Sequence, residues 1–250
     1  MDDKRRISLF FFILVLIFFY LPIIMLVVLS FNNSRGFSWG GFSLKWYIEL
    51  FRNSPDLWEA VLRSILIAIG SSFLSVVIAT LGAIAIKWYN FKVKKYVKFI
   101  SYIPLVIPDI IMGISLAIFF ANIVKGGVPL SMWTIFIAHT TFNIPFALFI
   151  IMSRLDEFDY SVVEAYDLGA SEFTTLVKVI IPMMMPGIIA GFLMAVTLSF
   201  DDFVITSFVS GNGQPTLPIY IYASIKRGVS PVVNALSVIL IIGTIILTFS

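Results

Sequence analysis

Residues on which many enzymes depend are scarce or absent in this chain. It contains no cysteine, so disulfide bonds and thiolate metal sites are excluded. His139 is the only histidine, and the one Asp-x-x-Asp spacing, Asp156 to Asp159, has no second copy that would complete a metal site. No Gly-x-x-x-x-Gly-Lys-Ser/Thr loop occurs, so any ATP hydrolysis linked to this chain must take place on another subunit. These absences argue against an enzyme and against a cofactor bound by this chain itself.

Charged residues are also few. Asp, Glu, Lys and Arg make up 12% of the chain, compared with about 25% in ordinary soluble domains. Hydrophobic residues make up 60%, and the mean hydropathy is +1.02. The net charge of +3 is small. It is more typical of lysines that flank membrane segments than of a nucleic-acid-binding surface. The composition therefore predicts an integral membrane protein.

Six apolar segments approach the ~20 residues that a helix needs to cross a bilayer. They are Ile7–Ser30, Leu62–Ile86, Phe99–Phe120, Trp133–Met152, Met183–Ser207 and Val232–Phe249. Lipid offers no partner to exposed backbone groups, so we predict an all-α membrane protein with six transmembrane helices. The first segment follows basic residues as a signal peptide does. Its apolar run is too long and no small-residue cleavage site follows it, so we predict a retained helix.

The distribution of lysine and arginine predicts the orientation in the membrane. The N-terminal tail is basic, and so is the link between the second and third segments, with Lys87, Lys92, Lys94, Lys95 and Lys98. Basic links lie preferentially on the cytoplasmic side. Both termini are therefore expected to be cytoplasmic.

Two connecting regions are too long to be simple turns. Residues 31–58 are rich in Gly, Ser, Asn and aromatics and are expected outside, so the chain divides into an N-terminal helix with its outer loop, 1–58, and a core transmembrane domain, 59–250. The inner link, 153–182, is acidic and has apolar residues at roughly helical spacing on both sides of Gly169, where a helix can stop. Because the inner leaflet is itself negative, such a link suits a docking site for a cytoplasmic protein better than a lipid surface.

The inner link contains the sequence Asp167-Leu168-Gly169-Ala170-Ser171, followed by Val179-Ile180-Ile181-Pro182. This pattern resembles the "EAA" loop of ABC-importer permeases. In that family the loop carries a short coupling helix that docks in a cleft of the ATPase subunit. Val163 holds the place of the family's usual Glu, and Glu164 follows one residue later, a rotation of ~100° on a helix. The resemblance implies that the ATPase is contacted by Glu164, Ala165, Asp167, Leu168, Gly169, Ala170 and Ser171.

Further motifs lie outside this loop. They are Lys45-Trp46-Tyr47, Pro108-Asp109-Ile110, Arg154-Leu155, Ser199-Phe200-Asp201-Asp202, Ser207-Phe208-Val209-Ser210-Gly211 and Gly228-Val229-Ser230-Pro231. With these motifs the chain is similar to ABC-importer permeases of the spermidine/putrescine type, within the MetI-like, or type I importer, superfamily.

This resemblance implies a multi-pass permease subunit in the bacterial inner membrane. It would work with a second homologous permease subunit, two ATPase subunits that bind ATP and magnesium, and an extracytoplasmic polyamine-binding protein. A permease for another cationic small molecule and a proton-coupled secondary transporter are the alternatives. The sequence does not rank spermidine against putrescine.

Carboxylates occur inside the apolar segments, at Asp109 near the middle of the third and at Asp201 and Asp202 in the outer half of the fifth. A charge at membrane depth costs about 3 kcal/mol, so such groups usually face a pathway or a partner. All three are candidates for a cation pathway, and Pro104 and Pro108 free backbone carbonyls as further acceptors. The alternative is that one or both carboxylates pair with a basic group on the sister subunit or lie in water at the outer interface. Adjacent helix positions point ~100° apart, so one of the Asp201–Asp202 pair is expected to face the pathway, and the sequence does not say which.

Aromatic residues and the single histidine complete the set of candidates. Trp46, Tyr47, Tyr220 and Tyr222 are typical interfacial aromatics, and because aromatic faces hold ammonium groups they are also candidates to contact the cargo or its receptor. His139 stands near Thr140, Thr141 and Asn143, which favours a packed, hydrogen-bonding histidine over a proton relay.

Overall fold

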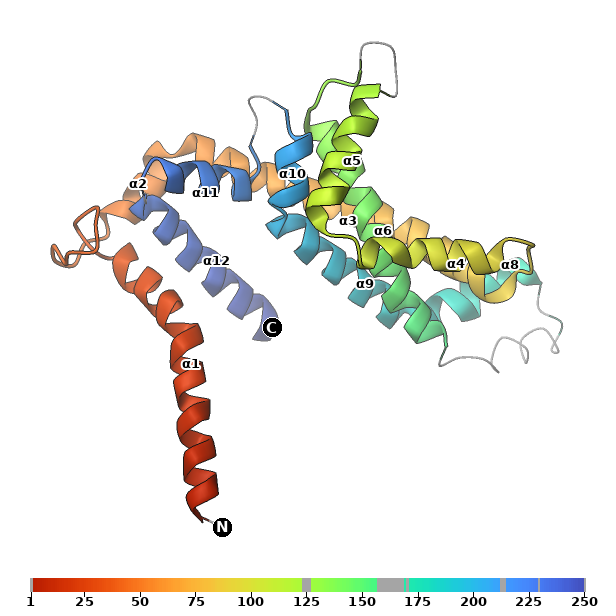
Figure 1. Ribbon diagram of the computed structural model, residues 1–250, viewed down its shortest axis with the longest axis horizontal. Coiled ribbons are helices and arrows are strands. Elements are labelled where there is room, and N and C mark those ends of the chain that lie inside the picture. Colours follow the sequence, from red (N-terminus) through yellow and green to blue (C-terminus); the bar gives the residue numbers. More distant parts are fainter. Residues whose placement is uncertain are drawn as a thin grey trace. The chain divides into compact units, whose positions relative to one another are not determined.

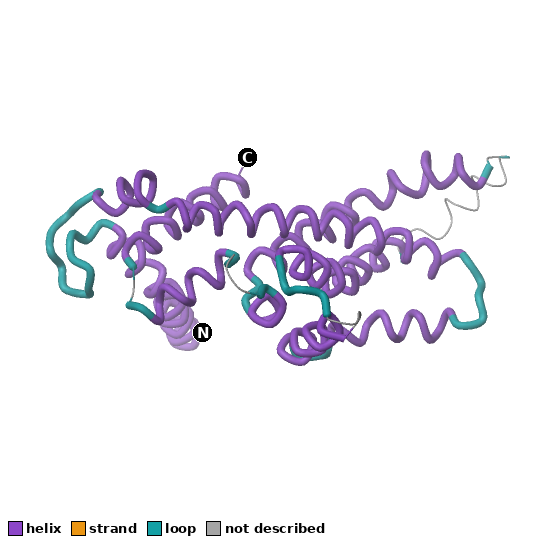
Figure 2. Tube along the Cα trace, turned by 90° about the horizontal axis from the view of Figure 1, so that it is seen from above, coloured by secondary structure: helices purple, strands orange, loops and turns teal. Residues whose placement is uncertain are grey.

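The computed structural model describes residues 2–122, 127–156, 169, 171–211, 215–228 and 230–249. Figure 2 shows that these residues form helices and loops. One isolated β-bridge joins Asn32 and Phe42. The prediction of an all-α protein is therefore confirmed for the described part of the chain. The backbone divides into two compact units, Met1–Glu59 with Tyr220–Ser250, and Ala60–Ile219.

The first unit is built around three helices. They are α1 (Asp2–Ser30), α2 (Lys45–Asn53) and α12 (Pro231–Phe249), and α12 packs against both of the others (Figure 1). The unit also holds the start of α3 (Pro55–Trp88) and most of α11 (Leu217–Lys226). The large apolar side chains of α1 are mostly exposed on the isolated chain, as expected of a helix whose surroundings are lipid or another membrane subunit.

A single buried asparagine organises the loop between α1 and α2. Asn32 Nδ2 donates to the carbonyl oxygens of Gly36 at 3.1 Å and Ser38 at 2.8 Å, and its Oδ1 accepts from the Gly40 N–H at 2.7 Å. The indole N–H of Trp46 donates to the backbone oxygen of Asn32 at 2.6 Å. The loop that the sequence marks only as Gly- and Ser-rich is thus folded onto α2.

The second unit contains the remaining helices. These are most of α3, then α4 (Lys94–Tyr102), η1 (Ile103–Leu105), α5 (Asp109–Asn122), α6 (Met132–Leu155), α8 (Glu172–Thr175), the π-helical turn η2 (Leu176–Ile180), α9 (Ile181–Asp201) and α10 (Val204–Val209). The α6–α9 pair forms its centre. Small residues allow the close approach, because a Cβ added at Gly191 would lie 3.5 Å from the Cα of Ala147.

Four described helical stretches are long and apolar enough to cross a membrane: Lys4–Ser30, Pro55–Trp88, Met132–Leu155 and Phe173–Asp201. A fifth span is possible if α4–η1 and α5, which meet at a bend of 110°, count as one, and α12 is a shorter apolar helix. These elements correspond to the six predicted segments. Two boundaries differ, because the third segment is broken near its middle and the fifth ends at Asp201 instead of Ser207.

Candidate functional site

The break in the third segment places Asp109 at a helix start. Residues 106–108 separate η1 from α5, and Pro108 lacks the N–H that a continuous helix would need. Asp109 is the first residue of α5, where the helix dipole favours a negative charge. Its side chain is exposed and makes no hydrogen bond or ion pair with another described residue. The expectation of an aspartate inside one continuous helix is therefore wrong, and the carboxylate lies instead at a break.

The second break lies between α9 and α10. Asp202 has an extended backbone, with ψ of 120°, and α10 resumes at Val204. The carboxylate of Asp202 caps this new helix, accepting from the N–H groups of Ile205 at 3.2 Å and Thr206 at 2.7 Å. Asp202 thus satisfies backbone donors that the break would otherwise leave without partners.

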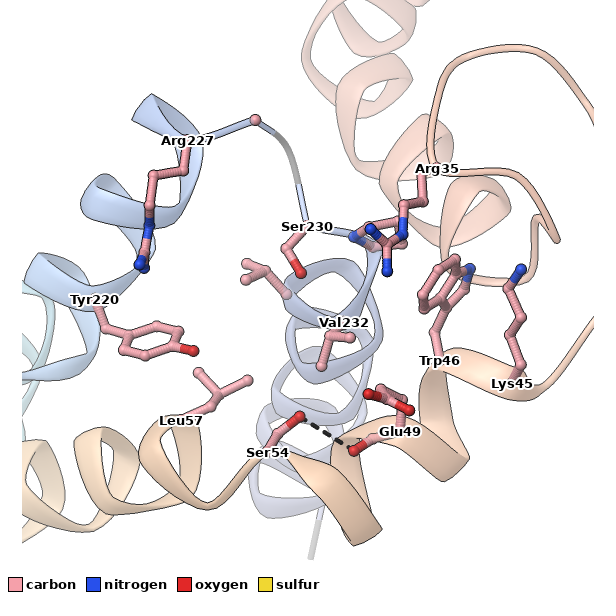
Figure 3. Close-up of a pocket in the computed structure, with 13 residues that line it drawn as sticks. Arg35, Lys45, Trp46, Glu49, Ser54, Leu57, Tyr220, Arg227, Ser230 and Val232 are labelled. Atoms are coloured by element: carbon pink, nitrogen blue, oxygen red, sulfur yellow. Dashed lines mark hydrogen bonds between the residues drawn. The ribbon is translucent and has the colours of Figure 1, made fainter.

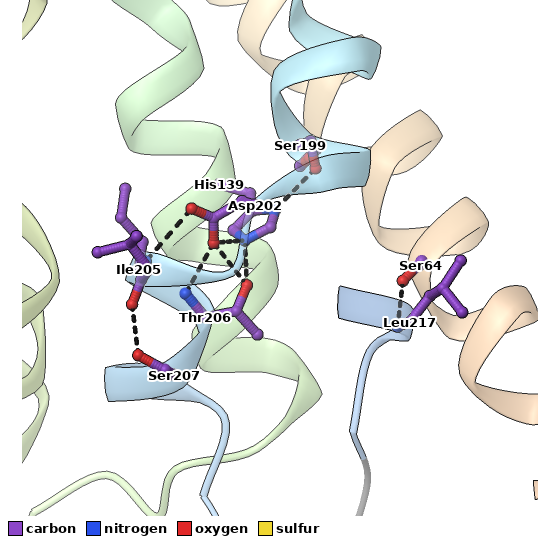
Figure 4. A network of polar contacts seen from close by, with 10 residues as sticks. Ser64, His139, Ser199, Asp202, Ile205, Thr206, Ser207 and Leu217 are labelled. Carbon is purple, nitrogen blue, oxygen red and sulfur yellow. Dashed lines mark hydrogen bonds and ion pairs between the residues drawn. The ribbon is translucent and has the colours of Figure 1, made fainter. Parts of the chain in front are cut away.

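Asp202 also belongs to a buried polar network that joins α3, α6, α9 and α10, and Figure 4 shows its centre. Its Oδ2 accepts from the Thr206 hydroxyl at 2.7 Å and lies 3.3 Å from His139 Nε2. On the other side of the ring, His139 Nδ1 lies 2.6 Å from Ser199 Oγ, which lies 3.3 Å from Ser71 Oγ. His139 is 1% exposed. The interpretation of His139 as a packed, hydrogen-bonding residue is confirmed.

The hydrogen bonds of this network show which atom donates in the contact between His139 and Thr206. The hydroxyl of Thr206 has one proton and donates it to Asp202, so it can only accept at its 2.9 Å contact with His139 Nε2. Nε2 therefore carries a hydrogen. The network holds the carboxylate of Asp202 toward α6 and away from the surface of the unit.

Asp201 has the opposite environment from its neighbour. It is the last residue of α9, its side chain is exposed, and it makes no ion pair or side-chain hydrogen bond with another described residue. The side chain of Asp202, in contrast, is 8% exposed and has a partner for each oxygen. Of the adjacent pair, Asp201 is the carboxylate that remains available to a ligand.

The two breaks lie at the same end of a packed helix pair. Helices α5 and α10 are in contact, and a Cβ on Gly113 would lie 2.7 Å from the Phe208 ring. The far ends of both helices approach the same segment, because Phe120 O accepts from Val128 N at 2.8 Å and Leu130 is the nearest neighbour of Gly211. The helices therefore run in the same direction, as Figure 1 also shows, and their starting ends lie side by side.

The predicted aromatic residues lie in the first unit and divide into two groups. Trp46 is buried and Tyr47 is half-buried with its hydroxyl 2.8 Å from Ser30 Oγ, so both have structural contacts of their own. Tyr220 is half-buried and Tyr222 is 45% exposed, with Lys226 Nζ 4.6 Å from the Tyr222 ring centre. Contact of these rings with a cargo or its receptor stays a prediction.

Most of the predicted coupling loop lies outside the described residues, namely Glu164, Ala165, Asp167, Leu168 and Ala170. Gly169 has a φ of +83°, a left-handed conformation that side chains rarely adopt. Ser171 is exposed, and its hydroxyl accepts from the Thr174 N–H at 3.3 Å at the start of α8. Coupling to an ATPase through these residues stays a prediction.

Sequence reasoning missed the residues that bind His139. It pointed to the neighbouring Thr140, Thr141 and Asn143, whereas the ring contacts Ser199 and Thr206, which are 60 and 67 positions away along the chain. The sequence carried one local signal, an aspartate directly before an apolar run, which is typical of a helix N-terminus, and this signal gave no indication of His139.

Comparisons with known proteins identify the class of this chain. Residues 78–250 match the family described as "Binding-protein-dependent transport system inner membrane component". The spermidine/putrescine transport system permease protein PotC of Escherichia coli K12 is 42% identical over 231 residues, which cover 92% of this chain and 86% of the relative. The corresponding protein of Haemophilus influenzae is 43% identical, over 88% of this chain and 85% of its own length. The putrescine transport system permease protein PotI of E. coli K12 is 40% identical, over 90% and 81%.

Two solved structures share the fold. One, titled as a bacterial ABC transporter involved in the import of the acidic polysaccharide alginate, superposes with a TM-score of 0.73 at 17% identity over 99% of this chain and 96% of the other. The MetNI methionine ABC transporter gives a TM-score of 0.63 at 21% identity over 83% and 95%. The prediction of a type I importer permease fold is confirmed. With apolar spans, a family match over most of its length and relatives above 40% identity, the chain belongs to the inner membrane permease components of binding-protein-dependent ABC transport systems.

Proposed function

We propose that this chain is a membrane subunit of an ATP-driven importer for polyamines of the spermidine and putrescine class. The relatives named above supply the substrate class, since those proteins are permeases of spermidine/putrescine and putrescine transport systems. The family description supplies the dependence on a binding protein.

The observation that carries the proposal is the pair of available carboxylates at the helix breaks. Asp109 and Asp201 are both exposed on the isolated subunit, and neither has a partner among the described residues. A carboxylate facing lipid would be costly, and broken helices at membrane depth occur where they line a cavity or contact protein. Two such carboxylates at neighbouring breaks suit the passage of a multiply charged amine. Asp202, which already caps α10, has a supporting role.

The family and the relatives of the chain support a specific assembly. The chain would pair with a second homologous permease subunit, two ATPase subunits and an extracytoplasmic polyamine-binding protein in the bacterial inner membrane, with both of its own termini in the cytoplasm. ATP and magnesium would bind to the ATPase subunits. The segment around Gly169 would couple them to the permease, and the left-handed backbone of Gly169 itself supports a sharp turn there.

The test is uptake of labelled spermidine and putrescine by proteoliposomes that contain the full complex, with ATP inside and the binding protein outside. Asp109→Asn and Asp201→Asn should each slow uptake while the complex still assembles, because asparagine keeps the shape and removes the charge. Asp56→Asn is the matched control, since Asp56 is exposed at the start of α3 and has no place in the proposed pathway. Wild-type uptake by both pathway variants would contradict the proposal.

A further inference from the structure

The first unit contains an open pocket that the proposed cation pathway does not use (Figure 3). It has a volume of about 740 Å³ and is lined by the loop after α1, α2, the start of α3, Tyr220 of α11, the residues that follow α11 and the start of α12. The outer loop 31–58, which contributes Arg35, Lys45 and Trp46, is the part of the chain expected to face the outside of the membrane. All lining residues belong to one compact unit, so this is a feature of the subunit itself.

The charge of the pocket is predominantly positive. Arg35, Lys45 and Arg227 line it, against a single carboxylate at Glu49. That carboxylate already accepts from Asn53 Nδ2 at 3.0 Å. None of the three cations makes an ion pair with a described residue. Arg227 Nε donates only to the Ala223 carbonyl, at 3.3 Å, and the guanidinium of Arg35 makes no hydrogen bond in the described part of the chain.

The aromatic side chain of Trp46 makes the pocket more favourable for anions than for cations. The Trp46 ring is occupied by the protein's own cations, with Lys45 Nζ 4.4 Å and Arg35 Cζ 5.9 Å from its centre. Trp46 is fixed in turn by its hydrogen bond to Asn32, so it holds the two cations at the edge of the pocket. A polyamine would be repelled here. Guanidinium groups with free donors are suited to carboxylates, which they bind in a two-pronged geometry.

We propose that this pocket receives acidic side chains of the extracytoplasmic binding protein and so docks the loaded receptor on the permease. Arg35 and Arg227 form the direct pairs with the incoming carboxylates, and Lys45 adds positive charge beside them. Tyr220, whose ring points into the pocket in Figure 3, provides a hydroxyl donor. The proposal rests on the proposed function, which supplies the binding protein as the partner.

The test measures binding of the purified binding protein to the complete complex in nanodiscs. The Arg35→Gln/Arg227→Gln double variant should bind about tenfold more weakly than wild type, with a smaller dependence of the dissociation constant on salt. Arg52→Gln is the control, because Arg52 is an exposed cation on the same helix α2 that does not line the pocket. Its affinity should stay within about twofold of wild type.

Charge reversal gives a second, independent readout. Arg227→Glu should weaken binding of the binding protein further. Replacing the matching acidic residue of the binding protein with arginine should then restore binding. Such a rescue would not occur if Arg227 had a merely structural role. Unchanged affinity in the double variant, or an equal loss in Arg52→Gln, would overturn the proposal. A loss that appears only in nanodiscs with anionic lipid would also overturn it, in favour of a lipid headgroup site.

The same preparation separates this inference from the proposed function. If the wild-type complex takes up no polyamine and binds no binding protein, the proposed function fails. If the wild-type complex transports polyamine and the pocket variants bind the receptor as tightly as wild type, only the pocket inference fails.

Discussion

Removal of the carboxylate of Asp202 should destabilise the subunit, whereas removal of the adjacent carboxylate of Asp201 should not. Asp202→Ala deletes the cap of α10, a change that typically costs about 1 kcal/mol. It also deletes the local contact with Thr206 Oγ1 and the contact with His139 Nε2 on α6, and an interhelical contact such as the one with His139 is worth about 0.6–1.7 kcal/mol in membrane proteins. The free energy of unfolding should therefore fall by about 2–3 kcal/mol.

The control is Asp201→Ala, which removes a carboxylate of the same type one residue earlier. Its side chain is exposed and has no described partner, so the free energy of unfolding should change by less than about 0.5 kcal/mol. Both values can be measured by SDS titration of the purified subunit in mixed micelles, followed by tryptophan fluorescence. Equal losses in the two variants, or none in Asp202→Ala, would refute the assignment of Asp202 as the structural member of the pair.

A double-mutant cycle measures the contact between His139 on α6 and Asp202 before α10. His139→Leu removes both ring nitrogens, and its combination with Asp202→Ala should be less destabilising than the sum of the single changes. The coupling energy should be about 0.6–1.7 kcal/mol. Strict additivity would show that Asp202 acts only as a cap and that His139 contributes nothing through it.

The remaining predictions concern transport and packing. Asp109→Glu and Asp201→Glu should retain more polyamine uptake than the asparagine variants at the same positions, because charge matters more than side-chain length in a cation pathway. Gly169→Leu should abolish ATP-driven uptake while the subunit still inserts, since it forces a side chain into a backbone with φ of +83° at a cost of about 1–2 kcal/mol. Gly113→Val should lower the free energy of unfolding by about 1–3 kcal/mol, because even a Cβ there would lie 2.7 Å from the Phe208 ring.

Each of these variants has a control or a contradicting result. Uptake by the glutamate variants no better than by the asparagine variants would show that charge is not what these positions supply. A Cβ at Gly169 would meet no atom within 4 Å, so Gly169→Ala tests the backbone alone, and normal uptake in Gly169→Leu would remove the coupling role. Gly243→Ala, where a Cβ also meets no neighbour, is the control for Gly113 and should not be destabilising.

The sequence by itself determined that this chain crosses a membrane and where most of its helices lie. This follows because lipid provides no partner for backbone groups, so a long apolar run has to be helical whatever its neighbours are. It also identified the unusual carboxylates, because a charge inside an apolar segment stands out without any structure. The motifs of the acidic inner link were enough to indicate the permease family before any fold was known.

Only the tertiary structure decided what each carboxylate does. The choice between Asp201 and Asp202 depends on where α9 ends, and that end is stabilised by His139 and Thr206, which lie on other helices. The docking pocket likewise brings Arg35 and Arg227 together from distant parts of the chain. The length of an apolar run indicates that a segment prefers lipid. The direction of a polar side chain at a helix break depends instead on hydrogen bonds between segments far apart in the sequence, and no local pattern records them.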